Sequence, residues 1–137
     1  MPKPKPSWID KVNASKPPVV KPAPENFAGM LKGQMMLIPS PKLLDSFIRA
    51  LPEGKGVDMA TMRSELAKQN RAVVSCPVTT GIVLRTVVEA ANEARAKGAN
   101  INTITPVWRV VDSKAAVLKK VTFDPKWILE ARAREGI

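Results

Sequence analysis

The 137-residue sequence contains no histidine, no tyrosine and a single cysteine, Cys76. Without histidine, the chain lacks the usual general base near neutral pH and the commonest metal ligand. This excludes Ser-His-Asp and Cys-His catalysis, and with one cysteine it also excludes zinc sites built from cysteine and histidine. We therefore expect neither a metal site nor a cofactor. A single cysteine forms no internal disulfide, which favours a reducing compartment.

Long hydrophobic runs are also absent. No stretch approaches the roughly 20 apolar residues that span a bilayer, and the N-terminus has no apolar run of the signal-peptide type. We expect a soluble cytoplasmic protein without a membrane partner, and most simply a monomer.

Basic residues dominate the charged part of the sequence. The 22 Lys and Arg against 12 Asp and Glu give a net charge of +10 and a pI of about 10.1. This balance predicts a polyanionic partner, which is DNA, RNA or an anionic membrane surface, and does not choose among them. Hydrophobic residues make up 45% and aromatic ones 4%, which predicts one compact, mostly aliphatic core.

The N-terminal segment differs from the remainder of the chain. Its first 24 residues hold seven of the 13 prolines and five lysines, with Asp10 as the only acid. Because proline neither continues a helix nor donates to a sheet, we predict an extended, flexible segment over 1–25, with one helical turn around Trp8. A folded domain then covers 26–137. Two interpretations stay open for the segment: a solubilising leader, or a basic arm that adds phosphate contacts.

The spacing of apolar residues and the positions of capping residues predict the regular elements of the domain. We expect a short strand over Met35–Ile38. Four helices are expected: from Pro41 to about Leu51, from Met59 to about Gln69, from Pro77 to about Lys97, and one that follows Asp124 and Pro125.

The second and third of these helices, connected through residues 70–75, outline a helix-turn-helix whose second helix would meet DNA. β-rich runs over 104–111 and 116–122, joined by Asp112-Ser113-Lys114, predict a hairpin that would form a wing. The predicted fold is therefore mostly α with a small β hairpin, that is, an α+β winged helix-turn-helix.

Several short motifs resemble a known family through their joint order. They are Pro52-Glu53-Gly54-Lys55, Pro106-Val107-Trp108-Arg109-Val110-Val111 and Trp127-Ile128-Leu129-Glu130. In this order they are similar to the DNA-binding domain of alkylguanine–DNA alkyltransferases, from about Leu37 to Gly136. A closer resemblance is to small bacterial alkyltransferase-like proteins, through Cys76-Pro77-Val78-Thr79-Thr80-Gly81-Ile82 and Thr105-Pro106-Val107-Trp108-Arg109.

The resemblance implies that the alkyl-transfer reaction is lost. In the family a cysteine follows the motif's proline, and a neighbouring histidine, oriented by a glutamate, generates its thiolate. Here Val107 and Trp108 stand at the cysteine and histidine positions, between the retained Pro106 and Arg109, and Glu135 matches the glutamate. We therefore expect a protein that is not an enzyme. Cys76 precedes the recognition helix, so we interpret it as a packing residue and not as a displaced nucleophile.

The third helix carries the predicted DNA contacts in its first turns. Thr79 and Thr80 are expected to hydrogen-bond phosphates or base edges. Gly81 aligns with the family's arginine that fills the gap left by a flipped base, and Met59 aligns with a family tyrosine, so base flipping is in doubt. Arg85 either substitutes for that arginine or pairs with Glu89.

Four further residues complete the predicted interface. Lys55, Arg63, Lys114 and Lys119 are expected to form a rim that binds phosphates. Trp108 stacks on a base or packs in the core, and Arg109 bridges segments or contacts DNA. We expect a non-enzymatic protein that binds double-stranded DNA and senses alkylated or otherwise damaged DNA. The alternative is an RNA-associated, ribosome-associated or protein-interaction module that reuses the fold.

Overall fold

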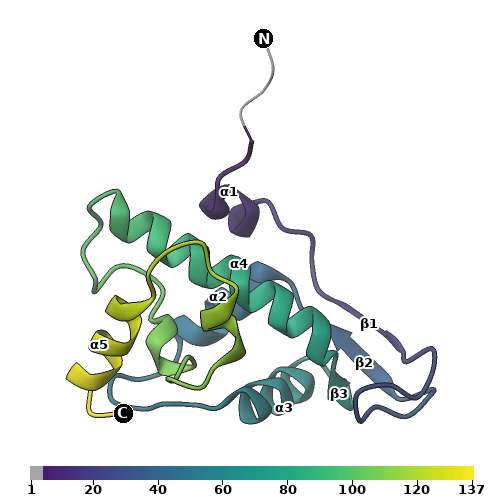
Figure 1. The fold of residues 1–137 in the computed structure, drawn as a ribbon. Helices are drawn as coiled ribbons and strands as arrows, with labels where there is room; N and C mark the ends of the chain where they lie inside the picture. Colours follow the sequence, from purple (N-terminus) through teal and green to yellow (C-terminus); the bar gives the residue numbers. More distant parts are fainter. Residues whose placement is uncertain (1–4) are drawn as a thin grey trace.

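The computed structural model describes residues 5–137, which fold into five α-helices and a small three-stranded sheet (Figure 1). Residues 1–4, among them Lys3 of the predicted basic arm, lie outside the described residues. The elements in chain order are α1 (Trp8–Asn13), β1 (Val19–Pro22), β2 (Met35–Ile38), α2 (Pro41–Arg49), α3 (Met59–Gln69), β3 (Val74–Ser75), α4 (Pro77–Ala96), the 3-10 turns η1 (Val107–Arg109) and η2 (Ala116–Lys119), and α5 (Lys126–Arg134). This is the α+β class that the sequence predicts. Among residues 5–137, the helices are too short or too polar to span a bilayer.

The helices begin where the predicted capping residues stand. At the start of α2, Ser40 Oγ accepts a hydrogen bond of 3.1 Å from the Leu43 amide. At the start of α3, Asp58 Oδ1 accepts one of 2.7 Å from the Thr61 amide. Pro77 opens α4 in the first turn, where its missing N–H leaves no hydrogen bond unmade. The predicted starts of these helices are confirmed.

Three helices end in the same C-terminal motif, in which a residue in the left-handed conformation turns the chain away. Glycine takes this position after α4 (Gly98, φ +94°) and after α5 (Gly136, φ +75°). After α3 it is taken by Arg71, with φ +58°, and the Ala72 amide donates to the Ala67 carbonyl at 2.8 Å. A side chain other than glycine in this conformation costs on the order of 1 kcal/mol.

The sheet has the order β1-β2-β3 and lies at the opposite end of the molecule from α5 (Figure 1). β1 pairs antiparallel with β2, and β2 pairs parallel with β3. The loop over 23–34 extends the β1–β2 ribbon, because Ala23 donates to the Gln34 carbonyl at 2.8 Å and Phe27 bridges to Met30. The predicted strand Met35–Ile38 is confirmed as β2.

The segment over 1–25, predicted to be flexible and separate, contributes two elements to the folded unit. α1 packs on α4, where Glu93 accepts hydrogen bonds of 3.1 and 3.3 Å from the amides of Trp8 and Ile9, and Val12 is buried. β1 forms an edge strand of the sheet. Most of the prolines flank these elements, so they leave their hydrogen bonds intact. The folded unit therefore begins well before residue 26.

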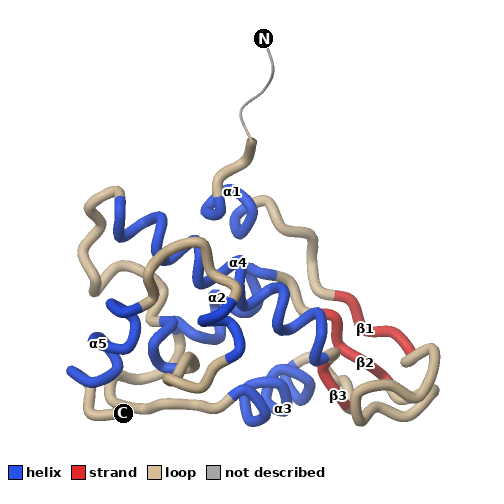
Figure 2. The backbone as a smooth tube through the Cα atoms, viewed as in Figure 1, coloured by secondary structure: helices blue, strands red, loops and turns tan. Residues whose placement is uncertain are grey.

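The predicted wing is wrong, because the strands of the described residues all lie in the N-terminal sheet (Figure 2). An inverse γ-turn centred on Pro106 (φ −77°, ψ 65°) ends the extended run, with the Val107 amide donating to the Thr105 carbonyl at 2.7 Å. Two 3-10 turns, η1 and η2, follow. Consecutive side chains from Ile104 to Trp108 are all buried, which the alternating faces of a two-stranded wing do not permit.

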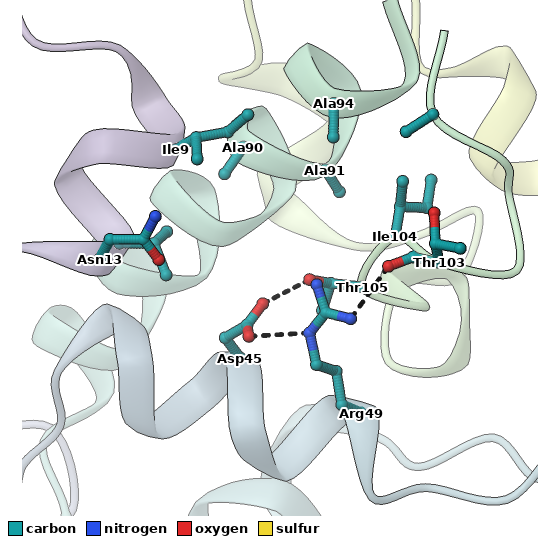
Figure 3. A pocket seen from close by; sticks show the side chains of 12 residues that line it. Ile9, Asn13, Asp45, Arg49, Ala90, Ala91, Ala94, Thr103, Ile104 and Thr105 are labelled. Atoms are coloured by element: carbon teal, nitrogen blue, oxygen red, sulfur yellow. Dashed lines mark hydrogen bonds and ion pairs between the residues drawn. The ribbon is translucent and has the colours of Figure 1, made fainter. Parts of the chain in front are cut away.

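Polar contacts fasten this irregular segment to the helices. Asp45 of α2 accepts a hydrogen bond from the Thr105 hydroxyl and forms an ion pair of 2.9 Å with Arg49 (Figure 3). Arg49 Nη1 in turn donates to the Thr103 carbonyl. These residues line a pocket of about 160 Å³ beneath α1. The segment between α4 and α5 is thus held by these side chains and by the Val57 amide, which donates to the Arg109 carbonyl at 2.8 Å, and not by a strand ladder.

Substitution of Trp8 by alanine tests whether α1 belongs to the fold. The half-buried indole lies over α4, so we expect the free energy of unfolding to fall by roughly 1–2 kcal/mol. Urea denaturation followed by circular dichroism measures it, with the exposed Lys5→Ala as control. Equal stabilities for both variants would show that α1 does not contribute.

Candidate nucleic-acid interface

The first turn of α4 exposes one of the two threonines predicted to contact DNA. Thr79 is half-buried, and its hydroxyl donates to Cys76 Sγ at 3.3 Å. Thr80 is fully buried, and its hydroxyl donates to the Cys76 carbonyl at 2.7 Å. The predicted DNA contact of Thr80 is therefore wrong, because the helical turn directs that side chain into the core.

Open space surrounds Gly81, where an added Cβ would meet no atom within 4 Å. Val78 and Ile82 beside it are 50% and 63% exposed. The tip of α4 is therefore apolar and accessible, and it offers backbone and methyl groups where the sequence predicts polar contacts to bases.

Arg85 does not pair with Glu89, contrary to one of its two interpretations. Its guanidinium lies 5.5 Å from the centre of the Trp8 ring, and its Nε is buried without a hydrogen-bond partner. Glu89 instead accepts from the amide and the hydroxyl of Thr122, at 2.5 and 2.7 Å. Arg85 is thus held against α1.

The outer side of α4 beyond its first turns is covered by two other segments. α1 lies along it through Glu93, and the C-terminal segment crosses it through Thr122 and through Trp127, whose Nε1 donates to Asn92 at 3.0 Å. The α3–α4 connection spans 70–76, includes β3 and is longer than the tight turn of a helix-turn-helix. The exposed residues of α4 lie in its first turns and at its C-terminal end.

The four predicted rim residues stand on three parts of the chain. Lys114 and Lys119 are exposed on the segment that carries η2, which packs against α4. Arg63 of α3 is half-buried beside Pro77, where both line a pocket of about 260 Å³. Lys55 is exposed in the loop before α3. The structure thus brings Arg63 close to the tip of α4, and Lys114 and Lys119 onto one segment beside that helix.

The motif Pro106-Val107-Trp108-Arg109 forms the start of the C-terminal half of the core. Val107 is fully buried, and Trp108 is 5% exposed with its ring edge-on to Trp127. Arg109 Nη1 donates to the Leu51 carbonyl at 2.8 Å. These side chains hold segments together, and the burial of Trp108 favours its interpretation as a core residue.

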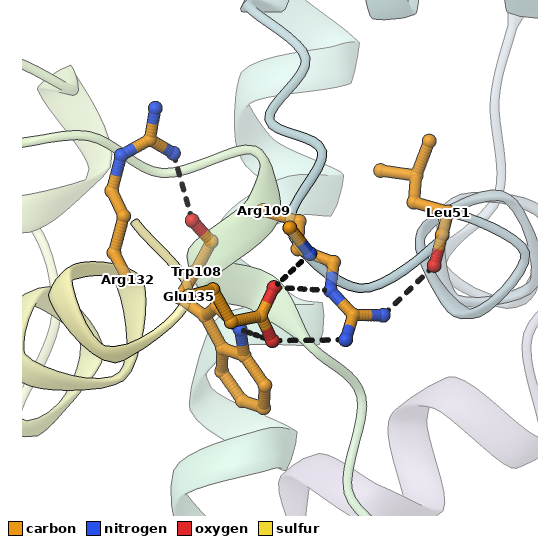
Figure 4. Close-up of polar contacts among 6 residues, drawn as sticks. Leu51, Trp108, Arg109, Arg132 and Glu135 are labelled. Atoms are coloured by element: carbon orange, nitrogen blue, oxygen red, sulfur yellow. Dashed lines mark hydrogen bonds and ion pairs between the residues drawn. The ribbon is translucent and has the colours of Figure 1, made fainter. Parts of the chain in front are cut away.

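One carboxylate, that of Glu135, connects three segments (Figure 4). Its Oε1 accepts from the Gly54 amide and from Arg109 Nε, both at 2.9 Å. Its Oε2 accepts from Trp108 Nε1 at 2.7 Å and from Arg109 Nη2 at 2.9 Å. Trp108, which stands where the resembling family has its histidine, thus donates its indole N–H to the glutamate.

The same contacts lower the pKa of the Glu135 carboxyl. The hydrogen bonds from Arg109 stabilise the charged form and outweigh burial, so that with the Gly54 amide and Trp108 they lower its pKa from 4.5 to about 2. The carboxylate stays charged at every physiological pH. It borders an open pocket of about 380 Å³ whose lining also includes Arg49, Glu53 and Asn102.

Sequence reasoning missed two acidic residues of α4 that fasten other segments. Glu89 binds Thr122, and Glu93 binds the first amides of α1. Burial raises the pKa of Glu93, but the amides of Ile9 and Trp8 outweigh it and hold the pKa below its ordinary value. The signal for Glu89 was present, since an acid directly after Val87 and Val88 interrupts a buried stripe.

Comparison with protein-family models, with curated proteins and with solved structures found no match for this chain. The resemblance to the alkyltransferase DNA-binding domain therefore stands on the motifs alone.

Glu135→Gln tests the carboxylate at the centre of this network. Because the folded pKa is depressed, its stabilisation is complete above about pH 4.5 and is lost as pH falls toward 2. At pH 7 we expect the variant to lose about 2 kcal/mol of stability, and to lose less between pH 4 and 2. Urea denaturation from pH 2 to 7 measures both. The exposed Glu130→Gln on the same helix is the control, and a parallel loss at all pH values would contradict the assignment.

Proposed function

We propose that this protein binds double-stranded DNA and performs no chemistry on it. The observation that carries the proposal is the imbalance of its charges. The structure describes all of the 22 Lys and Arg residues except Lys3. Within residues 5–137, ion pairs are formed by three of them: Arg49, Lys97 and Arg109. The other basic side chains of that part have no acidic partner within the protein.

Most acidic residues, in contrast, accept hydrogen bonds from the protein. Eight of the 12 accept hydrogen bonds from the protein, and they are Asp10, Asp45, Asp58, Glu89, Glu93, Asp112, Asp124 and Glu135. Acids therefore cap turns and hold segments, while most lysines and arginines are exposed; the half-buried exceptions are Arg63, Arg85, Arg109 and Arg132. This arrangement supports a polyanionic partner, whose phosphates replace the missing counter-charges.

Two features support contact with the DNA backbone over reading of base edges. The tip of α4 presents Val78, Gly81 and Ile82, which donate no side-chain hydrogen bond. Arg85, the nearest candidate for a base contact, lies against Trp8. Sequence-independent binding through phosphates needs neither, so we propose little preference for base sequence.

The absence of alkyl transfer follows from the side chains in the motif. Val107 stands where the resembling family has its nucleophile, and a buried valine has no lone pair to attack an alkyl carbon. Cys76 begins α4 and accepts a hydrogen bond from Thr79. Incubation with methylguanine-containing duplex is expected to leave Cys76 unmodified, and a methyl group on it by mass spectrometry would overturn this part of the proposal.

Salt dependence tests the DNA binding itself. We expect log Kd to rise linearly with log salt concentration, and Lys119→Ala to reduce the slope by about 0.9, the value for one lost phosphate contact. Lys97→Ala removes an equal charge that is paired with Glu93, and it should leave the slope unchanged. Fluorescence anisotropy of a labelled duplex, recorded at salt concentrations from roughly 50 to 300 mM, measures both slopes.

Binding to three nucleic acids, an alkylguanine duplex, the matched undamaged duplex and duplex RNA, distinguishes damage sensing, general DNA binding and RNA binding. Tighter binding to an alkylguanine duplex than to the matched undamaged one would support damage sensing, and equal affinities would leave general DNA binding. Tighter binding to duplex RNA of the same length would favour an RNA-associated module. No binding to any of them at low salt would refute the proposed function.

A further inference from the structure

All eight exposed large hydrophobic side chains of residues 5–137 lie at one end of the molecule. We name this region, residues 19–38 and 70–82, the sheet end, because it contains the three strands, the loop over 23–34 and the tip of α4. The eight are Val19, Val20, Phe27, Leu31, Met35, Val73, Val78 and Ile82. Phe27 and Leu31, in the loop, are 52% and 59% exposed. Exposed apolar side chains gathered at one end of a molecule, here on both faces of the edge strand β1, are typical of a contact site.

The charges at the sheet end are mainly positive. Lys21, Lys32 and Arg71 are exposed there against the single acid Glu25, and none of these basic residues has an ion pair. Arg63 adds a fifth charged side chain, in a pocket that it shares with the loop over 28–30, with β3 and with the start of α4. The fitting partner therefore offers negative charge and apolar surface together.

Arg71 supports a role for these charges. The equivalent positions after α4 and α5 are glycines, which adopt the left-handed conformation without strain, whereas Arg71 adopts it at φ +58°. No hydrogen bond or ion pair of its side chain within residues 5–137 compensates for that strain. Arg71 therefore presents a charge without an acidic partner at the end of α3, where a phosphate of a partner can pair with it.

We infer that the sheet end enters a groove of duplex DNA, where Phe27 and Leu31 act as apolar wedges that unstack a base step and bend the duplex. Two-stranded β-ribbons enter DNA grooves, and apolar side chains placed at base steps kink the helix while basic residues hold the flanking phosphates. Duplex DNA is the favoured occupant because the apolar side chains adjoin the tip of α4, the accessible part of the proposed DNA interface. The inference rests on the proposed DNA binding and adds a mode of contact to it.

Bending is measured by energy transfer between dyes on the two ends of a duplex of about 30 base pairs, and unstacking by the fluorescence of 2-aminopurine within it. Both signals should rise with wild-type protein. Phe27→Ala/Leu31→Ala should abolish both and weaken Kd roughly fivefold to 20-fold, since two half-exposed side chains lose their buried contact. The salt slope should stay the same, because no phosphate contact is removed.

Leu129→Ala is the matched control. Leu129 is a half-buried leucine of α5, at the opposite end of the molecule, and its loss should change neither signal (Figure 1). Thermal unfolding of each variant checks that the fold is intact, which we expect for the exposed positions Phe27 and Leu31.

Arg71 gives a second test with effects of opposite sign. Arg71→Gly should raise Tm by about 2 °C, because it relieves strain, while it lowers the salt slope by about 0.9. Arg71→Lys keeps the charge and should bind DNA with the wild-type slope.

Two outcomes overturn the inference while the proposed function stands. One is salt-dependent DNA binding without bending or unstacking. The other is bending that the Phe27→Ala/Leu31→Ala variant retains. In that case, binding of phosphatidylglycerol vesicles by the wild type only would assign the sheet end to a lipid surface, and no such binding would assign it to a protein partner. Absence of any DNA binding refutes the proposed function instead.

Discussion

The carboxylate of Glu135 is the interaction on which the C-terminal half of this structure depends. It accepts four hydrogen bonds, from the Gly54 amide, from Trp108 and twice from Arg109. The segments that it joins form no strand ladder with one another, and side-chain contacts hold them together with one backbone hydrogen bond, from the Val57 amide to the Arg109 carbonyl. A carboxylate is suited to this role because each oxygen accepts two hydrogen bonds, and its four donors offset the loss of water around the charge.

The use of acids as hydrogen-bond acceptors and the exposure of most bases connect the fold with the proposed function. Glu89 and Glu93 use their carboxylates to hold backbone amides of segments packed on α4. Three of the acids that accept hydrogen bonds, Asp45, Glu93 and Glu135, also form the ion pairs of residues 5–137. Most of the other basic side chains are exposed, which favours a polyanionic partner.

The two ends of the molecule differ in physical character. The end around α5 holds the ion pair of Arg109 with Glu135, and all eight exposed large hydrophobic side chains of residues 5–137 lie away from it. The sheet end leaves apolar side chains and unpaired cations in solvent. Contacts with a partner are expected where the protein does not satisfy its own groups, which separates the resemblance motif around Trp108 from the proposed binding surface.

Local patterns were sufficient for the helices and for β2, because a cap such as Ser40 or Asp58 and a period of 3.6 residues act within a few residues of the chain. They were insufficient wherever burial depended on distant segments. The β-rich run ending at Val111 became a 3-10 turn because its consecutive side chains are enclosed between α4 and α5. Thr80 is buried although Val78 and Gly81 close by are exposed, because the packing of α4 on the core decides which side of the helix faces inward. Net charge and the lack of histidine were readable from the sequence. The location of the unpaired positive charge was decided by the tertiary structure, because folding determines which basic residues come within reach of an acid.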